Sequence, residues 1–178
     1  MPSIAAIKQH LARGGVIAYP TESCYGLGCD PYQPTAVERI LRLKGRPRHK
    51  GLILIAASSG QLQPYVHLPP VEQTVPYWPG PFTLILPARP RAGRWLTGRH
   101  KGLAVRVTAH AGASRLCREL GMALVSTSAN RSGFKALKTA QACRRQFGEQ
   151  VMVLPGRIGN SKNPSTIIHF ASGKVLRG

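Results

Sequence analysis

Apolar residues recur at helical spacing in several parts of the chain. Downstream of Ser3 this spacing predicts a short N-terminal helix that ends near Gly14. A second helix is predicted to start at Pro34 and Thr35 and to carry one apolar stripe through Lys44. The same reasoning predicts further helices over 58–65, 113–120 and 139–147.

Short apolar runs between proline, glycine and polar turns predict strands. They lie at 16–19, 52–56, 82–86, 102–108, 122–126, 151–154, 166–170 and 175–176. The glycine-punctuated stretch from Pro20 to Pro34 is predicted to be a loop, as are the proline-rich patches 64–70 and 87–94. Because helices and strands alternate imperfectly, we expect an α/β fold in which a mixed, twisted sheet is flanked by helices within one domain, 1–178.

The charge balance of the chain favours anionic partners. Its 178 residues include 25 Lys and Arg against six Asp and Glu, which gives a formal net charge of +19. Nucleic acid, nucleotides and acidic membrane surfaces are the partner classes that suit such an excess. The shortage of acids argues against a two-metal nuclease or a paired-carboxylate hydrolase, because both need several converging carboxylates.

The cysteines and the apolar runs exclude other classes. Cys24, Cys29, Cys117 and Cys143 form no C-x-x-C pair, so neither a zinc site nor a disulfide framework is indicated. The N-terminus has no signal-peptide core, and no apolar run approaches the length of a membrane span. The sequence therefore predicts a cytoplasmic protein with reduced thiols and no membrane partner.

A cluster of cations precedes the apolar run 52–55. It contains no acid and consists of Arg39, Arg42, Lys44, Arg46, Arg48 and Lys50. Cations at a helix C-terminus complement the helix dipole, which accounts for one or two of these charges. The other interpretation is a cradle for a polyphosphate, in which Lys44 is a point charge and Arg46 a planar fork. Neither side chain is expected to belong to the core.

Two further segments carry candidate ligand-binding groups. In VSTSAN, Ser126, Ser128 and Asn130 follow a buried strand, where open α/β sheets commonly hold phosphate or carboxylate. A hydrogen-bonded turn is an equally good interpretation of this segment. Arg106 is the one charge on an apolar strand and must reach either solvent or a partner.

These segments together resemble the YrdC family over nearly the whole chain. The resemblance rests on GGVIAYPTESCYGLGCDP, the K-x-R of Lys44 and Arg46, KGLILIAA, WPGPFTLILPA, LAVRV, VSTSANRSG and NPST. The family signature is the K-x-R together with the S-x-N of Ser128 and Asn130. Many members carry P-T-[DE]-T-x-Y-G, where this chain has Ser23 and Cys24, so the role of Ser23 is open.

The resemblance implies an enzyme, a nucleotidyltransferase. Family members condense L-threonine, bicarbonate and ATP into threonylcarbamoyl-AMP and release pyrophosphate. Partner proteins then transfer the threonylcarbamoyl group to the adenosine 3′ of the anticodon in tRNAs that read ANN codons. The implied fold is YrdC-like with a basic concave surface, and the implied cofactor is Mg²⁺ held mainly by the ATP phosphates.

The resemblance also implies roles for individual residues. Lys44 and Arg46 would be catalytic and hold the ATP phosphates, and Ser128 and Asn130 would hold the adenylate side. Arg106 would pair with the threonine carboxylate. The remaining residues that would line the site are threonine-binding Thr21, Ser126 and Ser165 and, as a pocket wall, Tyr25. No protein ligand to a metal and no general base are indicated.

A second basic stretch keeps another class of function open. Arg89, Arg91, Arg94, Arg99 and Lys101 carry no acid among them, and contact with RNA would explain them, as would a solvated loop. The alternative function is therefore a non-catalytic basic RNA-binding module. Against it, the chain has no standard RNA-binding signature and few aromatic residues for base stacking. A phosphate-binding regulatory domain without turnover is a third possibility.

Overall fold

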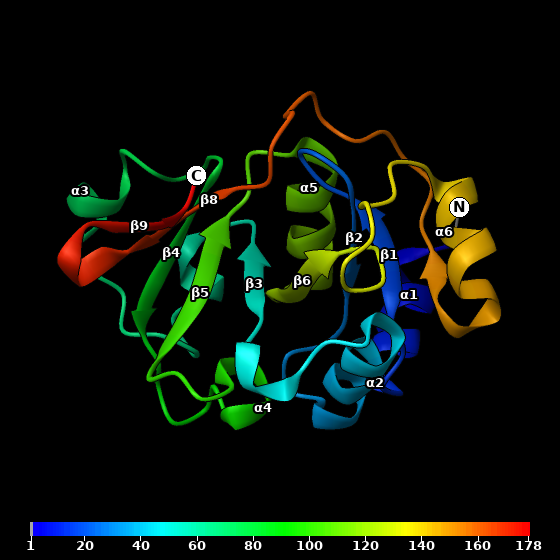
Figure 1. Ribbon diagram of the computed structural model, residues 1–178, viewed down its shortest axis with the longest axis horizontal. Coiled ribbons are helices and arrows are strands. Elements are labelled where there is room, and N and C mark those ends of the chain that lie inside the picture. Colours follow the sequence, from blue (N-terminus) through cyan, green and yellow to red (C-terminus); the bar gives the residue numbers. More distant parts are fainter. Residues whose placement is uncertain (1) are drawn as a thin grey trace.

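The computed structural model describes residues 2–178, and its centre is a nine-stranded mixed sheet with the order β7-β1-β2-β6-β3-β5-β4-β8-β9. Figure 1 shows the strands side by side, from β9 and β8 on the left to β1 on the right. The pairs β1–β7, β3–β5 and β4–β8 are parallel and the others antiparallel. The strands are β1 (Ile17–Pro20), β2 (Tyr25–Gly28), β3 (Ile53–Ala56), β4 (Phe82–Pro87), β5 (Gly102–Val107), β6 (Leu124–Ser128), β7 (Met152–Val153), β8 (Thr166–His169) and β9 (Lys174–Arg177).

Four of the five helices predicted from the sequence are present. Ser3 and Thr139 cap α1 and α6 by accepting hydrogen bonds from backbone N–H groups at 3.2 and 3.1 Å. The prediction over 58–65 was wrong, because only one 3₁₀ turn, Ser59–Gln61, forms before Pro64. The helices are α1 (Ile4–Ala12), α2 (Pro34–Lys44), α3 (Val71–Thr74), α4 (Arg94–Thr97), α5 (Ala111–Leu120) and α6 (Ala140–Phe147).

The predicted loop from Pro20 to Pro34 contains strand β2, which was not predicted. Two of its four residues are glycines, and glycine is depleted in strands. Here close packing requires it, because a Cβ on Gly28 would lie 2.6 Å from the Val125 carbonyl oxygen and 2.7 Å from the Tyr19 ring. The glycines therefore mark a close approach of neighbouring groups.

The two faces of the sheet are covered to different extents. On one face, apolar side chains of β3, β4, β5 and β6 pack with α2 and α6 in the larger core cluster. On the other face, α1 and α5 cover one end, where Ile17, Ile55 and Leu124 are buried. Elsewhere on the same face, residues such as Ser126 and Ala104 line a cavity instead. Within residues 2–178, no helix is long and apolar enough to cross a bilayer.

Residues 154–165, the crossing segment, run from β7 near one edge of the sheet to β8 near the other. Figure 1 shows this segment arching over the ends of the strands. Its backbone is fixed to the loop after β1, because Gly159 N–H donates to the Thr21 carbonyl at 2.9 Å and Ser161 N–H to the Glu22 carbonyl at 3.1 Å. The crossing segment thereby brings Ser165 to the cavity.

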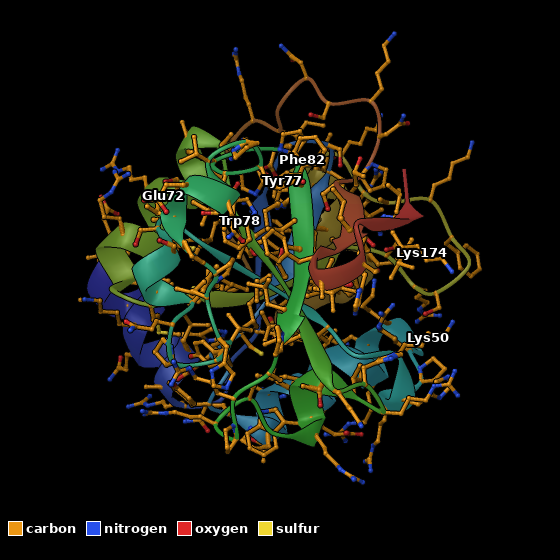
Figure 2. All side chains as sticks on the ribbon, turned by 90° about the vertical axis from the view of Figure 1, so that its left-hand side faces the viewer. Lys50, Glu72, Tyr77, Trp78, Phe82 and Lys174 are labelled. Atoms are coloured by element: carbon orange, nitrogen blue, oxygen red, sulfur yellow. The ribbon has the colours of Figure 1, made fainter. Side chains whose placement is uncertain are left out.

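Aromatic side chains lie at the start of β4, where β8 pairs with it. Tyr77 contacts Phe82 and Phe170 edge to face, with ring centroids 5.6 and 6.4 Å apart. Trp78 Nε1 donates to the Phe82 carbonyl at 3.0 Å. Figure 2 shows Tyr77, Trp78 and Phe82 together at this end of the strand. Phe170 directly follows β8, so this cluster links β4 to the C-terminal strands.

Candidate functional site

A cavity of about 1170 Å³ lies over the part of the sheet that α1 and α5 leave uncovered. Its walls come from the loop after β1, the segment after α2, helix α4, the loop after β6, the end of the crossing segment and the strands β2, β3, β4, β5, β6, β8 and β9. Seven of the nine residues predicted to form the site line it: Thr21, Arg46, Arg106, Ser126, Ser128, Asn130 and Ser165. Lys44 and Tyr25 do not.

The two cations of the K-x-R motif point in different directions, because helix α2 ends between them. Gly45 ends the helix in the left-handed conformation at φ 59°, which glycine adopts without strain. Lys44, before this turn, points into the protein, whereas Arg46, after it, lines the cavity. Arg46 Nη2 donates to the Gly51 carbonyl at 2.9 Å, which fixes the guanidinium at the cavity wall.

The expectation that Lys44 lies outside the core was wrong. Its side chain is buried, and its ammonium group donates to the Ser128 carbonyl, to the Asn130 carbonyl at 2.9 Å and to Asn130 Oδ1 at 3.0 Å. Three acceptors match the three donors of an ammonium group. Burial and, to a smaller extent, the neighbouring Arg46 lower the pKa of Lys44 to about 8. Lys44 therefore holds the S-x-N turn in place from the protein interior, on the side away from the cavity.

The S-x-N segment is both a hydrogen-bonded turn and part of the cavity wall, so the two interpretations of VSTSAN are compatible. Ser128 Oγ donates to Asn130 Oδ1 at 2.6 Å, and Asn130 Nδ2 donates to the carbonyls of Arg131 at 3.0 Å and Phe134 at 2.6 Å. Thr127, Ser128 and Asn130 still line the cavity. The turn is thus held rigidly against Lys44 while it faces the open space.

Arg106 is buried and does not project into solvent. Its Nη2 lies 3.1 Å from Glu22 Oε2, and Thr108 Oγ1 donates to Glu22 Oε1 at 2.6 Å. Arg106 Nε is buried without a hydrogen-bond partner. Arg106 also lines the cavity, so its guanidinium lies between an internal carboxylate and the space that a ligand would fill.

Arg177 also lines the cavity, although no sequence pattern indicated it. Its Nη2 donates to the Ser165 carbonyl at 2.8 Å and to Ser165 Oγ at 3.2 Å. Burial and the guanidiniums of Arg106 and Arg46 lower the pKa of Arg177. Arg177 thus joins Arg46 and Arg106, which come from distant parts of the chain, at one cavity. No motif accompanies Arg177, and only the pairing of β9 with β8 brings it there.

Tyr25, predicted to be a pocket wall, belongs to the core. Its side chain is buried in the larger core cluster, and its hydroxyl donates to the Gly156 carbonyl at 2.9 Å. Successive residues of a strand face opposite sides of the sheet. The neighbouring Gly26 therefore faces the cavity and Tyr25 does not.

The second basic stretch is divided between two places. Arg99 and Lys101 line the same cavity as Arg46, whereas Arg89, Arg91 and Arg94 lie outside its described lining. Arg91 lies over the Tyr32 ring, with its Cζ 4.4 Å from the ring centroid, and Tyr32 stacks on Tyr65 at 4.9 Å. Trp95 is partly exposed nearby in α4, and its Nε1 donates to the Pro31 carbonyl at 3.0 Å.

The comparisons with known proteins agree with this geometry. The Sua5/YciO/YrdC family model, described as telomere recombination, matches residues 9–178. The chain belongs to the Sua5/YciO/YrdC family.

Bacterial members of the Sua5/YciO/YrdC family match the chain over almost their whole length. Those of Chromobacterium violaceum and Thiobacillus denitrificans are both named threonylcarbamoyl-AMP synthase and are 56% identical to it. The alignments cover 96% and 94% of this chain and 90% and 91% of the relatives. The resemblance inferred from the motifs is therefore confirmed.

Solved structures of the Sua5/YciO/YrdC family confirm the fold. E. coli YciO is 27% identical and has a TM-score of 0.82 over 99% of this chain and 90% of its own. The structure of P. abyssi Sua5 complexed with L-threonine is 32% identical, with a TM-score of 0.82 over 93% of this chain. This chain spans about half the length of that Sua5, because the match covers 50% of it.

Groups that would ligate a metal are scarce at the site of this Sua5/YciO/YrdC chain. Among residues 2–178, no three His, Cys, Asp or Glu side chains gather as a metal site would require. The described lining of the cavity includes hydroxyls, an amide, histidines and cations, but no carboxylate. Hard cations such as Mg²⁺ prefer carboxylate oxygens, so the protein groups of this cavity do not fit a resident Mg²⁺.

Proposed function

We propose that this chain is a threonylcarbamoyl-AMP synthase that condenses L-threonine, bicarbonate and ATP and releases pyrophosphate, and thus a nucleotidyltransferase. The observation that carries the proposal is the meeting of Arg46, the S-x-N turn and Arg106 at one cavity. Relatives with 56% identity bear this name, and a family structure contains L-threonine.

The chemistry explains why a cationic cavity suffices. The amine of threonine attacks bicarbonate and gives a carbamate and water. A carbamate oxygen then attacks the α-phosphate of ATP, and the bond to the β-phosphate breaks as pyrophosphate leaves. Every reactant except the amine is an anion, so the site has to hold anions in line and neutralise the charge that develops. Once the carbamate has formed, the nucleophile needs no base.

Each side of the cavity suits one part of this reaction. Arg46 and Arg177, with Lys50 nearby, would hold the phosphates and stabilise the leaving pyrophosphate. Ser128 and Asn130 would hold the adenylate side, on the turn that Lys44 supports. The threonine end would consist of Arg106, for the carboxylate, and the hydroxyls of Thr21, Ser126 and Ser165.

We further propose that Mg²⁺ enters with the nucleotide, bound to its phosphates. In this proposal the protein provides cations and hydroxyls around the nucleotide and leaves coordination of the metal to phosphates and water. Arg46 and Arg177 would then contact the phosphate oxygens that the metal leaves free.

The product would serve tRNA modification together with partner proteins, at the adenosine 3′ of the anticodon in ANN-decoding tRNAs. The surface formed by Tyr32, Arg91 and Trp95 combines a cation with partly exposed aromatic rings, a combination that suits stacked bases and phosphates. We propose that direct contact with tRNA, where it occurs, uses this surface.

The test is pyrophosphate release by the purified protein with ATP, Mg²⁺, L-threonine and bicarbonate. Release should stop when threonine is omitted. Release that does not depend on threonine would refute the proposed reaction. Absence of any release, combined with salt-sensitive tRNA binding, would favour the alternative of a non-catalytic RNA-binding module.

A further inference from the structure

The cavity presents a problem of charge for an amino-acid substrate. Its described lining contains no Asp or Glu, and its cations are Arg46, Lys50, Arg99, Lys101, Arg106, Lys135, Lys138, Lys162 and Arg177. Such a surface attracts the phosphates of a nucleotide. The same surface repels the ammonium group of an amino acid. An amino acid binds as a zwitterion with no net charge, so it gains little from a purely cationic site. One end of the cavity therefore needs a compensating negative charge.

Glu22 provides that charge from just behind the cavity wall. Among residues 2–178 there are three side-chain ion pairs, and only Glu22–Arg106 includes a cavity-lining residue. Glu72 lies on the opposite side of the sheet from the cavity residue Lys50 (Figure 2). The other acids of the chain also lie outside the described lining.

The position of Glu22 is fixed by three parts of the fold. Its Oε2 lies 3.1 Å from Arg106 Nη2, with the two side chains 13% and 10% exposed, so solvent screens the pair weakly. Thr108 Oγ1, just after β5, donates to Oε1 at 2.6 Å. The crossing segment holds its backbone, through Ser161 N–H to the Glu22 carbonyl at 3.1 Å. A carboxylate fixed in this way offsets the positive charge of the Arg106 guanidinium and determines the direction in which the guanidinium points.

The hydrogen bonds around this pair are incomplete. Within residues 2–178, the buried side-chain polar atoms that make no hydrogen bond are Tyr19 Oη, Arg106 Nε and Glu22 Oε2, whose contact with Arg106 is an ion pair. Buried polar groups in folded proteins are nearly always satisfied, so each exception requires an explanation, such as a bound ion, a water or a role in catalysis. All three residues belong to this one end of the structure, since Tyr19 lies in β1, three residues before Glu22, and Glu22 is paired with Arg106.

We propose that Glu22 is a positioning residue that neutralises Arg106 and so divides the cavity into a near-neutral end for an amino-acid zwitterion and a cationic end for phosphates. The identity of the amino acid as threonine rests on the function proposed above. The remaining donors of Arg106 face the carboxylate of the substrate, and the negative charge of Glu22 offsets the repulsion that the ammonium group meets. A phosphate gains no electrostatic attraction at this end of the cavity, because Glu22 already cancels the charge of Arg106.

The deciding variant is Glu22→Gln, which keeps the shape and can still accept from Thr108 but removes the charge. The KM for threonine should rise at least tenfold, while the KM for ATP stays within about twofold, since one partner of a desolvated charge pair is lost only at the threonine end. Sulfate, as a probe anion, should become a stronger inhibitor that competes with threonine. A role in folding alone would not produce this gain of anion inhibition.

Two further variants separate charge from orientation. Thr108→Val keeps the charge of Glu22 but frees its carboxylate, so the KM for threonine should rise several-fold without stronger inhibition by sulfate. Glu119→Gln, which removes the acid of an exposed pair with Arg115 on α5, is the matched control and should behave as the unaltered protein. If Glu22→Gln does not fold, Glu22→Asp should raise the KM for threonine and leave sulfate inhibition unchanged.

The outcomes are distinct. An unaltered protein without threonine-dependent pyrophosphate release would refute the proposed function. With that release present, Glu22→Gln that leaves the KM for threonine unchanged, or raises both KM values equally, would refute the role of Glu22 alone. Stronger sulfate inhibition in the Glu22→Asp variant, whose charge is retained, would also refute it.

Discussion

Lys44 illustrates how a signature residue acts through its neighbour. Its ammonium group is used entirely by three oxygens of the S-x-N turn, and the described cavity lining does not include it. The two halves of the K-x-R/S-x-N signature are therefore one hydrogen-bonded unit. The sequence shows that both motifs are present, but not that one supports the other.

Replacement of Lys44 should reduce both stability and turnover. Lys44→Ala would leave the Asn130 carbonyl without its donor and remove one of the two donors of the Ser128 carbonyl. We expect a cost of about 2 kcal/mol or more in the free energy of unfolding. Misplacement of the turn should slow pyrophosphate release about a hundredfold. Thermal unfolding and steady-state kinetics measure the two effects. Lys8→Ala, on the exposed side of α1, is the matched control and should change neither.

The pH dependence of Lys44 follows from its lowered pKa. The pKa is about 8 in the folded protein and about 10.4 in an unfolded chain. Between these values the unfolded state binds more protons, so the contribution of Lys44 to stability rises with pH. The free energy of unfolding of the protein, minus that of Lys44→Met, should increase from pH 7 to pH 9.5. A decrease over this range would contradict the lowered pKa.

Turnover should show the opposite trend. Above about pH 8 the neutral amine has one donor too few for its three acceptors, so the S-x-N turn is held less firmly. We expect kcat to fall as the pH rises through about 8. A profile that stays flat to pH 9.5 would show that the charge of Lys44 is not needed.

Most of the candidate site could be predicted from the sequence because its residues lie in recognisable motifs. Arg46, Arg106 and Ser128 were found in this way. Glu22 and Arg177 were not, since their importance comes from contacts across the fold, with Thr108 and Ser165 respectively. The spacing of residues along the sequence does not reveal contacts between distant segments.

At the scale of elements, strand β2 shows where residue propensity fails to predict secondary structure. Periodicity found α2 and β5 because their apolar faces are regular, but Gly26 and Gly28 conceal a strand that is buried throughout. Tertiary packing decides the conformation there. The helix predicted over 58–65 did not form for the opposite reason. Its apolar residues have helical spacing, but Gly60 and Pro64 disfavour a helix there.

Gly28→Ala tests this account of β2. The added methyl group would lie 2.6 Å from the Val125 carbonyl oxygen, so β2 and β6 would have to separate. We expect a loss of about 2 kcal/mol in the free energy of unfolding, the usual size of an overpacking penalty. Gly60→Ala, whose Cβ would meet nothing closer than 3.8 Å, is the matched control for chemical denaturation. Equal stability of the two variants would contradict the account.

At the scale of the whole molecule, the excess of cations serves two surfaces. Arg91 and Arg94 lie outside the described cavity lining, whereas Arg99 and Lys101 are part of it. Replacement of Arg91 and Arg94 by Ala should weaken tRNA binding and reduce its salt slope by about two, with turnover intact. Replacement of Arg99 and Lys101 should instead raise the KM for ATP. Binding at two salt concentrations and steady-state kinetics distinguish the pairs, and reversed effects would refute the assignment.

The pairing of β4 with β8 has a consequence for the order of folding. Phe82 pairs with Thr166, so β4 keeps an open edge until a segment far along the chain reaches it. Pairings of such long range raise the contact order and slow folding, because a long loop must close before any contact forms. The last two strands of the chain, β8 and β9, directly follow Ser165, and β9 contains Arg177. In refolding, nucleotide binding should therefore appear only once β8 has paired with β4.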